Sequence, residues 1–579
     1  MKLRRVCSIT LLLLGAAGIF SGSCTAQSPV DPSQLPARTT FYLLWRGTPT
    51  GEIRKNNSLY ALWDDPDFSA ARSSFLESLL SNAGTQKDKT TLTRDELAEY
   101  VSLLDNSFLI GYSRRPETPA ASKTATTKTP PPAWNGLFFV YDRTGKEELL
   151  SKTVLRMRGT EKDVPKLTNL TVAGVPALRI ERKSGVTYWA ENGKYAVSAN
   201  EPGVFAEILN LLNGKPGSSS LSQSSAYQEA KSLLSGGVLE FFLSIPNVKE
   251  LALDSQGRSA SQLKPFLNAL KLDSVHSLAG HISLEGAKMR MAGAILGDTA
   301  PGGLFDIFAD GQANPASMAY ISSDTVYYSE SQFDLVGLYN TIKRVIAQAG
   351  PDTSQMIAPM ETMAATRLGM PLPQVLGLTT GEIASLQASP TLEDSQKVYM
   401  LGIRNKPDAL KLTRTIFGDQ LSSERNEGST TFLKISLRGG QSSSGVAQWN
   451  FYHLAMTPTL LLGATKSETL RKYLGQSPAG TAAVPQNILQ ARSQYPEKLG
   501  SFSYFNFQKI NWAAWKARSV SEMNKAASSA KSLDAAHSQK QFADWLNQVN
   551  PEVFPRHLHT MTGASWKDAK GVHFDEWLD

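Results

Sequence analysis

The feature that most constrains the fold of this chain is an internal repetition. Residues 140–155, VYDRTGKEELLSKTVL, are similar to residues 402–416, GIRNKPDALKLTRTI. In both stretches a short apolar run ends in an arginine, Arg143 or Arg404, and a polar turn leads into an amphipathic run. Self-similarity at a fixed offset is typical of a repeated module. The chain should therefore contain two modules with the same order of elements.

Further pairs of similar stretches follow in the same order along the chain. GVTYW pairs with GVAQW, ANEPGVFAEIL with ATKSETLRKYL, LEFFLSIPNVKEL with FSYFNFQKINWAA, and HSLAGHISLEG with HTMTGASWKDA. The last pair aligns His276 with His559. We therefore predict two homologous repeats, at residues 38–312 and 313–579.

The patterns inside each repeat predict an α+β fold. Short runs rich in β-branched and aromatic residues, bounded by Gly, Asn and Pro, are typical of strands. They include FYLLW, SFLIGYS, GLFFVYD, ALRIERK, VTYWAE and KYAVSA. Apolar residues spaced three and four apart predict helices between them, and Asp65 with Pro66 can cap and begin one helix. Hairpins followed by a returning helix favour mainly antiparallel sheets with helices packed on one face.

A segment rich in Pro, Thr, Ala and Lys, residues 114–134, interrupts the first repeat. Alone it would suggest a domain boundary. The corresponding place in the second repeat, ASPTLEDSQK, only joins two strands. We therefore predict that 114–134 is a long disordered loop within the first repeat.

The N-terminal residues predict export. Lys2, Arg4 and Arg5 precede the apolar run ITLLLLGAAGIF, and small residues follow it. This pattern is typical of a bacterial signal peptide, here residues 1–26, and its apolar run is too short for a comfortable membrane span. Residues 27–37 would form a short linker, and the mature protein would lie in the periplasm or on a membrane.

Cys24 has two interpretations. The sequence SGSC resembles the lipobox of bacterial lipoproteins, in which the cysteine becomes the lipidated first residue, although Ser21 stands where Leu is usual. Several acyl chains on Cys24 would anchor the protein to a membrane. Alternatively, cleavage after Ala26 would remove Cys24 with the signal. In either case the mature chain holds at most one of the two cysteines and cannot form an internal disulfide.

Composition argues against several classes of partner and cofactor. The net charge is +7, and loss of the signal leaves 56 basic and 52 acidic residues. With no Lys/Arg-dense stretch carrying interleaved aromatics, no nucleic-acid partner is predicted. The acids Asp64, Asp65 and Asp67 lack the glycine turn of a calcium loop and fit a helix N-terminus instead. The pair His557 and His559 has His573 and Asp575 downstream, and a zinc site needs three or four converging ligands. Since His559 matches His276 in the first repeat, where no H-x-H pair exists, a structural role is predicted. We predict no metal and no cofactor.

Sequence motifs of catalysis are also missing. There is no G-x-S-x-G elbow, no S-x-x-K set, no H-E-x-x-H and no phosphate-binding glycine loop. A dispersed catalytic site remains an alternative, because catalytic triads are spatial constellations. No catalytic residue is therefore predicted, and a non-enzymatic protein is favoured.

The stretch VTYWAENGKYAV suggests the one candidate contact for a partner. Trp189 recurs as Trp449 in the second repeat and is therefore predicted to be core. Tyr188 and the Asn192–Gly193 turn differ between the repeats. We predict that a partner contacts Tyr188, Asn192 and Gly193.

LPARTTFYLLW, LYALWDDPDFSAARSSFLESLL and YWAENGKYAVSANEPGVFAEILNLL, together with the signal and the strand–helix repetition, carry a family resemblance. The chain resembles a group of bacterial exported proteins with a domain of unknown function of the DUF3352 kind. The resemblance covers nearly the whole mature chain and implies an extracytoplasmic α+β protein. It implies no catalytic residues.

Two functional classes follow. The first is a non-catalytic cell-envelope protein that binds or scaffolds an unknown protein, peptide or polymer. The second is an envelope hydrolase with a dispersed active site between the repeats. Converging His, Ser or paired carboxylates in a pocket would favour the hydrolase, whereas an extended open sheet face or groove would favour the binding protein.

Overall fold

The computed structural model describes residues 30–74, 102–115, 135–156, 165–182, 185–215, 219–234, 236–256, 260–299, 303–348, 357–436, 453–476, 484–530 and 532–579. The chain divides into two compact units. Unit 1 comprises residues 1–63, 76–263 and 275–297, and unit 2 comprises residues 64–75, 264–274 and 298–579. None of the helices in the described ranges is long and apolar enough to cross a membrane.

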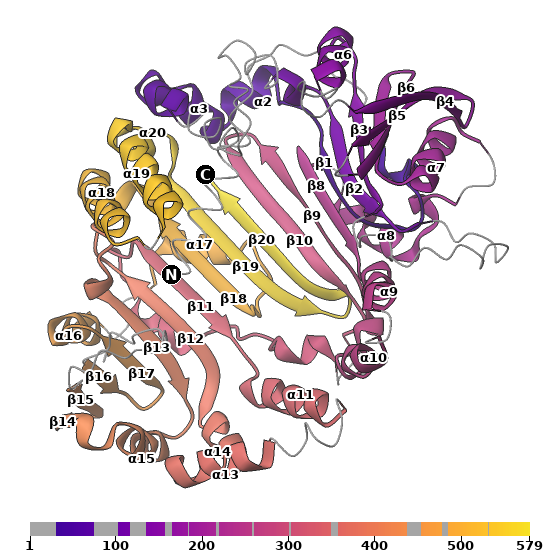
Figure 1. Ribbon diagram of the computed structural model, residues 1–579. Coiled ribbons are helices and arrows are strands. Elements are labelled where there is room, and N and C mark those ends of the chain that lie inside the picture. Colours follow the sequence, from indigo (N-terminus) through magenta and orange to yellow (C-terminus); the bar gives the residue numbers. More distant parts are fainter. Residues whose placement is uncertain are drawn as a thin grey trace. The chain divides into compact units, whose positions relative to one another are not determined.

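Unit 1 is built on an antiparallel sheet. Its strands are β1 (Thr39–Trp45), β2 (Phe108–Ser113), β3 (Leu137–Asp142), β4 (Lys166–Val172), β5 (Val175–Arg182), β6 (Gly185–Asn192), β7 (Tyr195–Ala199), β8 (Leu239–Ser244), β9 (Val275–Glu285) and β10 (Lys288–Gly297). The pairings give the strand order β4-β5-β6-β7-β3-β2-β1-β8-β9-β10. Figure 1 shows β8, β9 and β10 side by side.

Unit 2 has a second antiparallel sheet. Its strands are β11 (Tyr327–Gln332), β12 (Thr379–Gln387), β13 (Lys397–Ile403), β14 (Leu421–Glu427), β15 (Thr430–Ile435), β16 (His453–Met456), β17 (Leu460–Ala464), β18 (Ser501–Asn506), β19 (Thr560–Asp568) and β20 (Gly571–Leu578). Their order is β14-β15-β16-β17-β13-β12-β11-β18-β19-β20. This is the order of unit 1 with ten added to each strand number.

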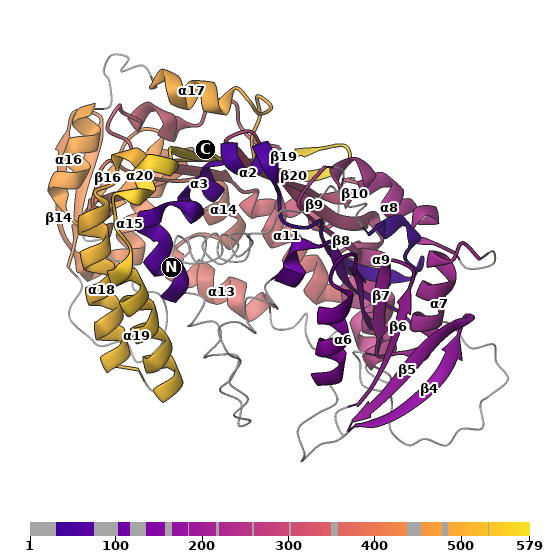
Figure 2. The same ribbon diagram turned by 90° about the horizontal axis from the view of Figure 1, so that it is seen from above.

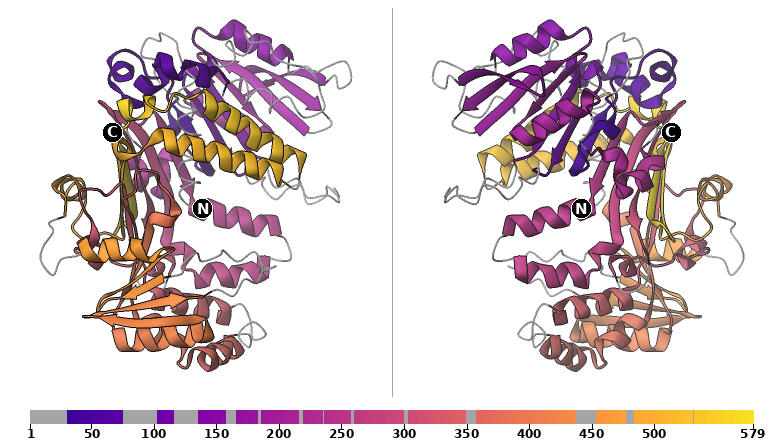
Figure 3. Two further views of the ribbon diagram at one scale, coloured as in Figure 1. Left: turned by 90° about the vertical axis from the view of Figure 1, so that its left-hand side faces the viewer. Right: turned by 90° about the vertical axis from the view of Figure 1, so that its right-hand side faces the viewer.

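Helices connect and cover the strands. Unit 1 contains α2 (Gly51–Asn56), α3 (Ser58–Asp64), α6 (Glu147–Arg156), α7 (Pro202–Leu212), α8 (Ser225–Ala230) and α9 (Ile245–Gln256), and α10 (Ala260–Ala269) spans the division between the units. Unit 2 contains α11 (Leu335–Gln348), α13 (Ile357–Leu368), α14 (Leu372–Gly377), α15 (Lys406–Phe417), α16 (Ser467–Gln476), α17 (Gln486–Arg492), α18 (Trp512–Ser528), α19 (Leu533–Gln548) and α20 (Val553–His557). The paired helices α18 and α19 are drawn in gold in Figure 3.

The predicted α+β class is confirmed, but helices do not lie on only one face of the sheet. In unit 1, Val140 packs in the same cluster as Phe205 of α7, whereas its neighbour Tyr141 packs in the cluster of Leu150 of α6. Successive residues of a strand point to opposite faces, so α6 and α7 cover opposite faces. Figure 2 shows these two helices on either side of β6 and β7. The prediction of a single helix-bearing face was wrong because both faces of this region are apolar.

Unit 2 has its own core on one face of its sheet. Tyr328 of β11 and Phe502 of β18 are buried together with apolar side chains of α16 and α17.

Asp65 caps the short 3-10 helix Pro66–Phe68, and its carboxylate accepts a hydrogen bond of 2.8 Å from the Asp67 N–H. This cap confirms the role predicted for Asp65 and Pro66.

Several sequence predictions fall outside the described residues. These are the signal with Cys24, most of the loop 114–134, and Trp449. The compact units also differ from the predicted repeat ranges, since unit 2 includes residues 64–75 and 264–274. The repeat limits stay a prediction.

Candidate binding face and pocket

Serines gather at adjoining positions of the unit 2 sheet. Ser329 of β11 lies opposite Ser385 of β12 on one side and opposite Ser503 of β18 on the other. One step along the strands, Ser331 lies opposite Ser501, which lies opposite Ser565 of β19. We call these six residues the serine face: Ser329, Ser331, Ser385, Ser501, Ser503 and Ser565.

The serine face lies on the side of the sheet opposite the core. Tyr328, Glu330 and Phe502, which alternate with these serines along the strands, are buried on the core side. All six serines are partly exposed. Their strands β11, β18 and β19 run side by side in Figure 1.

Half of these hydroxyls are available to a ligand. The Ser501 and Ser565 Oγ atoms are 2.7 Å apart, and Ser503 Oγ donates to the Gly563 carbonyl over 3.5 Å. The hydroxyls of Ser329, Ser331 and Ser385 form no hydrogen bond with another described residue. Each can therefore offer one donor and two acceptor positions.

A carboxylate ends the cross-strand row of serines. Gly563 lies between Ser503 and Glu576 of β20 in the register of the sheet. A Cβ at Gly563 would lie 3.1 Å from Ser503 Oγ, a tight contact, and 3.5 Å from Glu576 Cγ, an ordinary one, so a larger residue would crowd Ser503. Burial raises the pKa of the Glu576 carboxyl. The row thus joins hydroxyls to an acid that is more easily protonated than a solvated one.

The fold itself does not require serines here. In unit 1 the strands that hold the same places carry Leu43, Ile110 and Phe241 at the matching cross-strand positions. Leu43 is 37% exposed and Ile110 is 41% exposed. One strand order therefore carries an apolar row in unit 1 and a hydroxyl row in unit 2.

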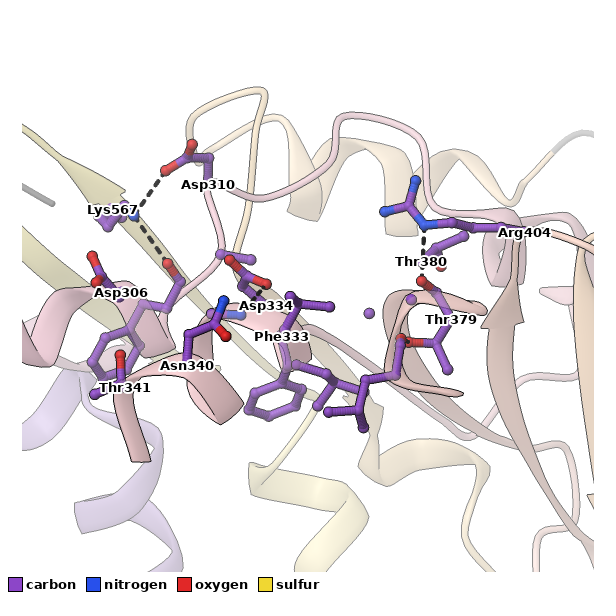
Figure 4. Close-up of a pocket in the computed structure, with 18 of the residues that line it drawn as sticks. Asp306, Asp310, Phe333, Asp334, Asn340, Thr341, Thr379, Thr380, Arg404 and Lys567 are labelled. Carbon is purple, nitrogen blue, oxygen red and sulfur yellow. Dashed lines mark hydrogen bonds and ion pairs between the residues drawn. The ribbon is translucent and has the colours of Figure 1, made fainter. Parts of the chain in front are cut away.

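The serine face leads along β11 to a pocket. Ser329, Ser331 and Phe333 point to the same side because they alternate along the chain. Phe333 is 41% exposed and lines an open pocket of about 520 Å³ within unit 2. Lys567 continues the line of Ser565 on β19 and also lines the pocket. Figure 4 shows Phe333 between Lys567 on one side and Arg404 on the other.

A glycine lets the backbone of β12 lie close to the backbone of Phe333 at this pocket. Gly381 has a φ of +86°, and a Cβ there would lie 2.1 Å from the Phe333 carbonyl oxygen. The Phe333 N–H donates to the Gly381 carbonyl over 3.0 Å. Only glycine fits this backbone conformation without strain, so β12 stays close to Phe333 while its register shifts.

Three acidic and three basic side chains line the pocket. Lys567 Nζ lies 2.9 Å from Asp310 Oδ1 and donates to the Phe308 carbonyl over 3.0 Å. Arg344 lies 3.9 Å from Asp306. Asp334 accepts the Gly337 N–H over 2.8 Å and so caps α11.

Arg404 is the remaining cation of the lining. It directly follows β13, and its Nε donates to the Thr379 carbonyl over 2.9 Å. Its two terminal nitrogens have no partner among the described residues, and the residue is exposed. The single bond to Thr379 orients the guanidinium and leaves its outer edge open.

A buried ion pair holds the strands beneath the serine face. Arg492 Nη1 is paired with Glu330 Oε1, and Arg492 Nη2 donates to the Gln312 and Ala313 carbonyls over 3.1 Å each. Tyr328 donates to the other Glu330 oxygen over 2.5 Å. Burial raises the pKa of the Glu330 carboxyl, although the charge of Arg492 opposes this shift.

The predicted contact residues lie in unit 1. Tyr188 packs against the core, with its ring centroid 5.7 Å from that of Phe205. Asn192 Nδ2 donates to Asn213 Oδ1 over 2.9 Å, and Gly193 makes the turn with a φ of +58°. Trp189 is half-buried and packs against the small cluster that contains Tyr141 and Leu150. The contact with a partner at Tyr188, Asn192 and Gly193 stays a prediction.

The serine face was missed at the sequence level. The signal for it was the alternation S-x-S in YYSESQ and SFSYF, which places two serines on one side of each strand.

The two histidines of the predicted H-x-H pair have protein partners. His557 Nε2 lies 2.8 Å from Asp65 Oδ2, and the backbone N–H of His559 donates to the Asp579 carbonyl. The described ranges contain no group of three His, Cys, Asp or Glu side chains that could hold a metal ion.

Comparison of the chain with protein families, with curated proteins and with solved structures found no match. The resemblance to proteins of the DUF3352 kind therefore stays a prediction.

Proposed function

We propose that this protein is an exported, non-catalytic cell-envelope protein that binds a polysaccharide through the serine face of unit 2. The observation that carries the proposal is the row Ser385, Ser329 and Ser503, next to which Ser331 lies opposite Ser501 and Ser501 lies opposite Ser565. Adjacent strands lie about 4.8 Å apart. The row therefore presents hydroxyls at a regular spacing to one extended ligand.

A sugar polymer matches this surface better than a protein does. The centres of protein interfaces are enriched in aromatic residues and depleted of serine. Sugar hydroxyls both donate and accept hydrogen bonds, as do the hydroxyls of Ser329, Ser331 and Ser385. The small serine side chains leave room for a ring to approach the backbone, and the exposed side chains of Ile383 and Tyr399 border them on the same face.

The non-catalytic part of the proposal is supported by the placement of the acids. Hydrolysis of a glycosidic bond ordinarily needs two carboxyl groups that flank the bond. Glu330 and Glu382 lie on the core side, where Arg492 pairs with Glu330 and the Ser317 N–H donates to Glu382. Glu576 is the acid at the end of the serine row. The three aspartates of the pocket also have partners: Asp310 pairs with Lys567, Asp306 lies 3.9 Å from Arg344, and Asp334 caps α11.

The shared strand order supports the proposed duplication. Both units repeat the same ten-strand order, and the matched stretches fall at matching places, such as the ends of β3 and β13. We propose that the two units descend from one ancestral module. The apolar row of unit 1 and the serine row of unit 2 would then reflect divergence of function.

Export and lipid anchoring at Cys24 complete the proposal, and they rest on the signal-like N-terminus. A Cys24→Ala substitution should move the protein from the membrane fraction to the soluble periplasmic fraction, because the acyl chains supply the anchoring energy. Fractionation of cells followed by immunoblotting measures this. Unchanged fractionation would contradict lipidation.

Co-sedimentation with purified peptidoglycan sacculi tests polysaccharide binding. The double substitution Ser329→Val and Ser385→Val removes two hydroxyls that are available to a ligand, and strands accept valine well. Since each neutral hydrogen bond contributes about 0.5–1.5 kcal/mol, loss of two should lower the affinity by about fivefold to a hundredfold.

Ser423→Val on the exposed strand β14 is the matched control, and it should leave binding unchanged. Wild-type protein that stays in the supernatant, or a double variant that pellets like wild type, would reject the serine face as the binding surface.

A further inference from the structure

Two of the three basic side chains in the pocket next to the serine face lie beside an acid, and the third does not pair with any acid that the structure describes. Two of its cations, Lys567 and Arg344, lie beside acids of the same pocket, Asp310 and Asp306. Arg404 has no acid beside it among the described residues. The three acids and three bases of the lining cancel in formal charge, so the pocket as a whole does not attract a highly charged polymer. It can accept one anionic group at Arg404.

The open edge of Arg404 suits a carboxylate. A guanidinium presents parallel N–H groups that match two carboxylate oxygens. The bond from Nε to the Thr379 carbonyl fixes the base of the group, and the two terminal nitrogens point away from that contact. An acid bound there would meet a preset donor pair and would lose little entropy in orienting it.

The other residues of the pocket suit a neutral sugar ring. Phe333 offers an exposed aromatic side chain as an apolar surface of the pocket. Asp334 and Asn340 are both exposed beside it, and their carboxylate and amide groups can bind sugar hydroxyls as acceptors and donors. Pockets that combine an aromatic surface with a few placed polar groups are typical binding sites for small ligands.

We infer that this pocket binds a saccharide unit that bears one carboxylate, with the carboxylate on Arg404 and the sugar ring over Phe333. The inference rests on the proposed function, because the same polysaccharide would continue from the pocket onto Ser331 and Ser329 along β11. It adds the chemical class of the sugar, an acidic one, and the residue that selects it.

The chain supplies a matched control for Arg404. Arg143 follows β3 in unit 1 as Arg404 follows β13 in unit 2. The Arg143 guanidinium donates to the Gly193 carbonyl over 2.9 Å and to Glu191 over 2.6 Å. Arg143 is thus paired with an acid, whereas Arg404 is open to a ligand.

Calorimetry with two disaccharides tests the inference on the full mature chain. The probes are GlcNAc–MurNAc, which carries a lactyl carboxylate, and chitobiose, which lacks it. We expect GlcNAc–MurNAc to bind about tenfold or more tightly than chitobiose. Arg404→Met should lower the affinity for GlcNAc–MurNAc to that for chitobiose, and Arg143→Met should change neither. Arg404→Lys keeps the charge but loses the paired donors, so it should retain an intermediate preference, which also guards against misfolding of Arg404→Met.

Each other outcome overturns the inference. Equal binding of the two disaccharides by wild type, or an unchanged preference in Arg404→Met, would show that Arg404 does not select a carboxylate. Comparable binding of a tri-glutamate peptide would assign the pocket to acidic peptides instead. If wild type pellets with sacculi but binds neither disaccharide, the inference fails while the proposed function stands; if wild type also fails to pellet, both fail.

Discussion

At the scale of single residues, the buried pair Glu330 and Arg492 determines how well the strand beneath the serine face is held. Both side chains are less than 10% exposed. Arg492→Met would leave the Glu330 carboxylate buried without its cation, which typically costs about 3–5 kcal/mol. Burial already raises the pKa of Glu330. The cost should therefore be largest at pH 7 and shrink as the pH falls, because the buried carboxyl is protonated at a higher pH than a solvated one and then no longer needs its cation.

Urea unfolding of the variant and of wild type at pH 7 and pH 5 measures both effects. A second substitution that removes the acid as well should restore the stability, and unit 1 shows which residue fits in its place. In unit 1 the position that matches Glu330 is Leu44, and the acid lies across the strand pair at Glu240, bound by Arg46. The double substitution Glu330→Leu and Arg492→Met should therefore recover most of the lost stability. A double variant as unstable as Arg492→Met alone would contradict the ion-pair explanation.

At the scale of elements, the sequence predicts the strands whose composition is apolar and aromatic. β1, β2, β3, β6 and β7 all coincide with predicted runs. The edge strands β4 and β14 were not predicted, because KLTNLTV and LSSERNE carry mostly polar side chains exposed at the edge of a sheet. Their identity as strands comes from pairing with β5 and β15, which single-residue propensity does not encode.

The candidate site was partly within reach of the sequence. Arg404 is singled out by its match to Arg143, yet its open guanidinium depends on the neighbouring Thr379 carbonyl. The serine face depends on register, because Ser329, Ser385 and Ser503 are far apart in sequence and meet only when β11 pairs with β12 and β18. A shift of one residue in either pairing would send a serine to the core face. Long-range register is the information that local patterns lack.

At the scale of the whole molecule, one segment belongs to a different unit from the residues that flank it in sequence. Residues 64–75 come early in the sequence but belong to unit 2. There Phe68 packs edge-on against Phe554 with ring centroids 6.4 Å apart, Trp545 Nε1 donates to the Ala71 carbonyl over 2.8 Å, and Arg556 pairs with Asp65. Unit 2 therefore depends on a segment that lies far from it in sequence.

This dependence predicts where a single early substitution acts. Phe68 is 6% exposed, so Phe68→Ala should cost about 3–5 kcal/mol through lost burial and a cavity. The loss should appear in unit 2, because local stability follows the cooperative unit to which a residue belongs. Hydrogen exchange followed by mass spectrometry should show faster exchange in α19, α20 and β18 and unchanged exchange in β1, β8 and α7. Phe205→Ala, in the unit 1 core, should give the reverse pattern. If Phe68→Ala instead speeds exchange in the unit 1 strands, residues 64–75 stabilise unit 1, and the prediction is wrong.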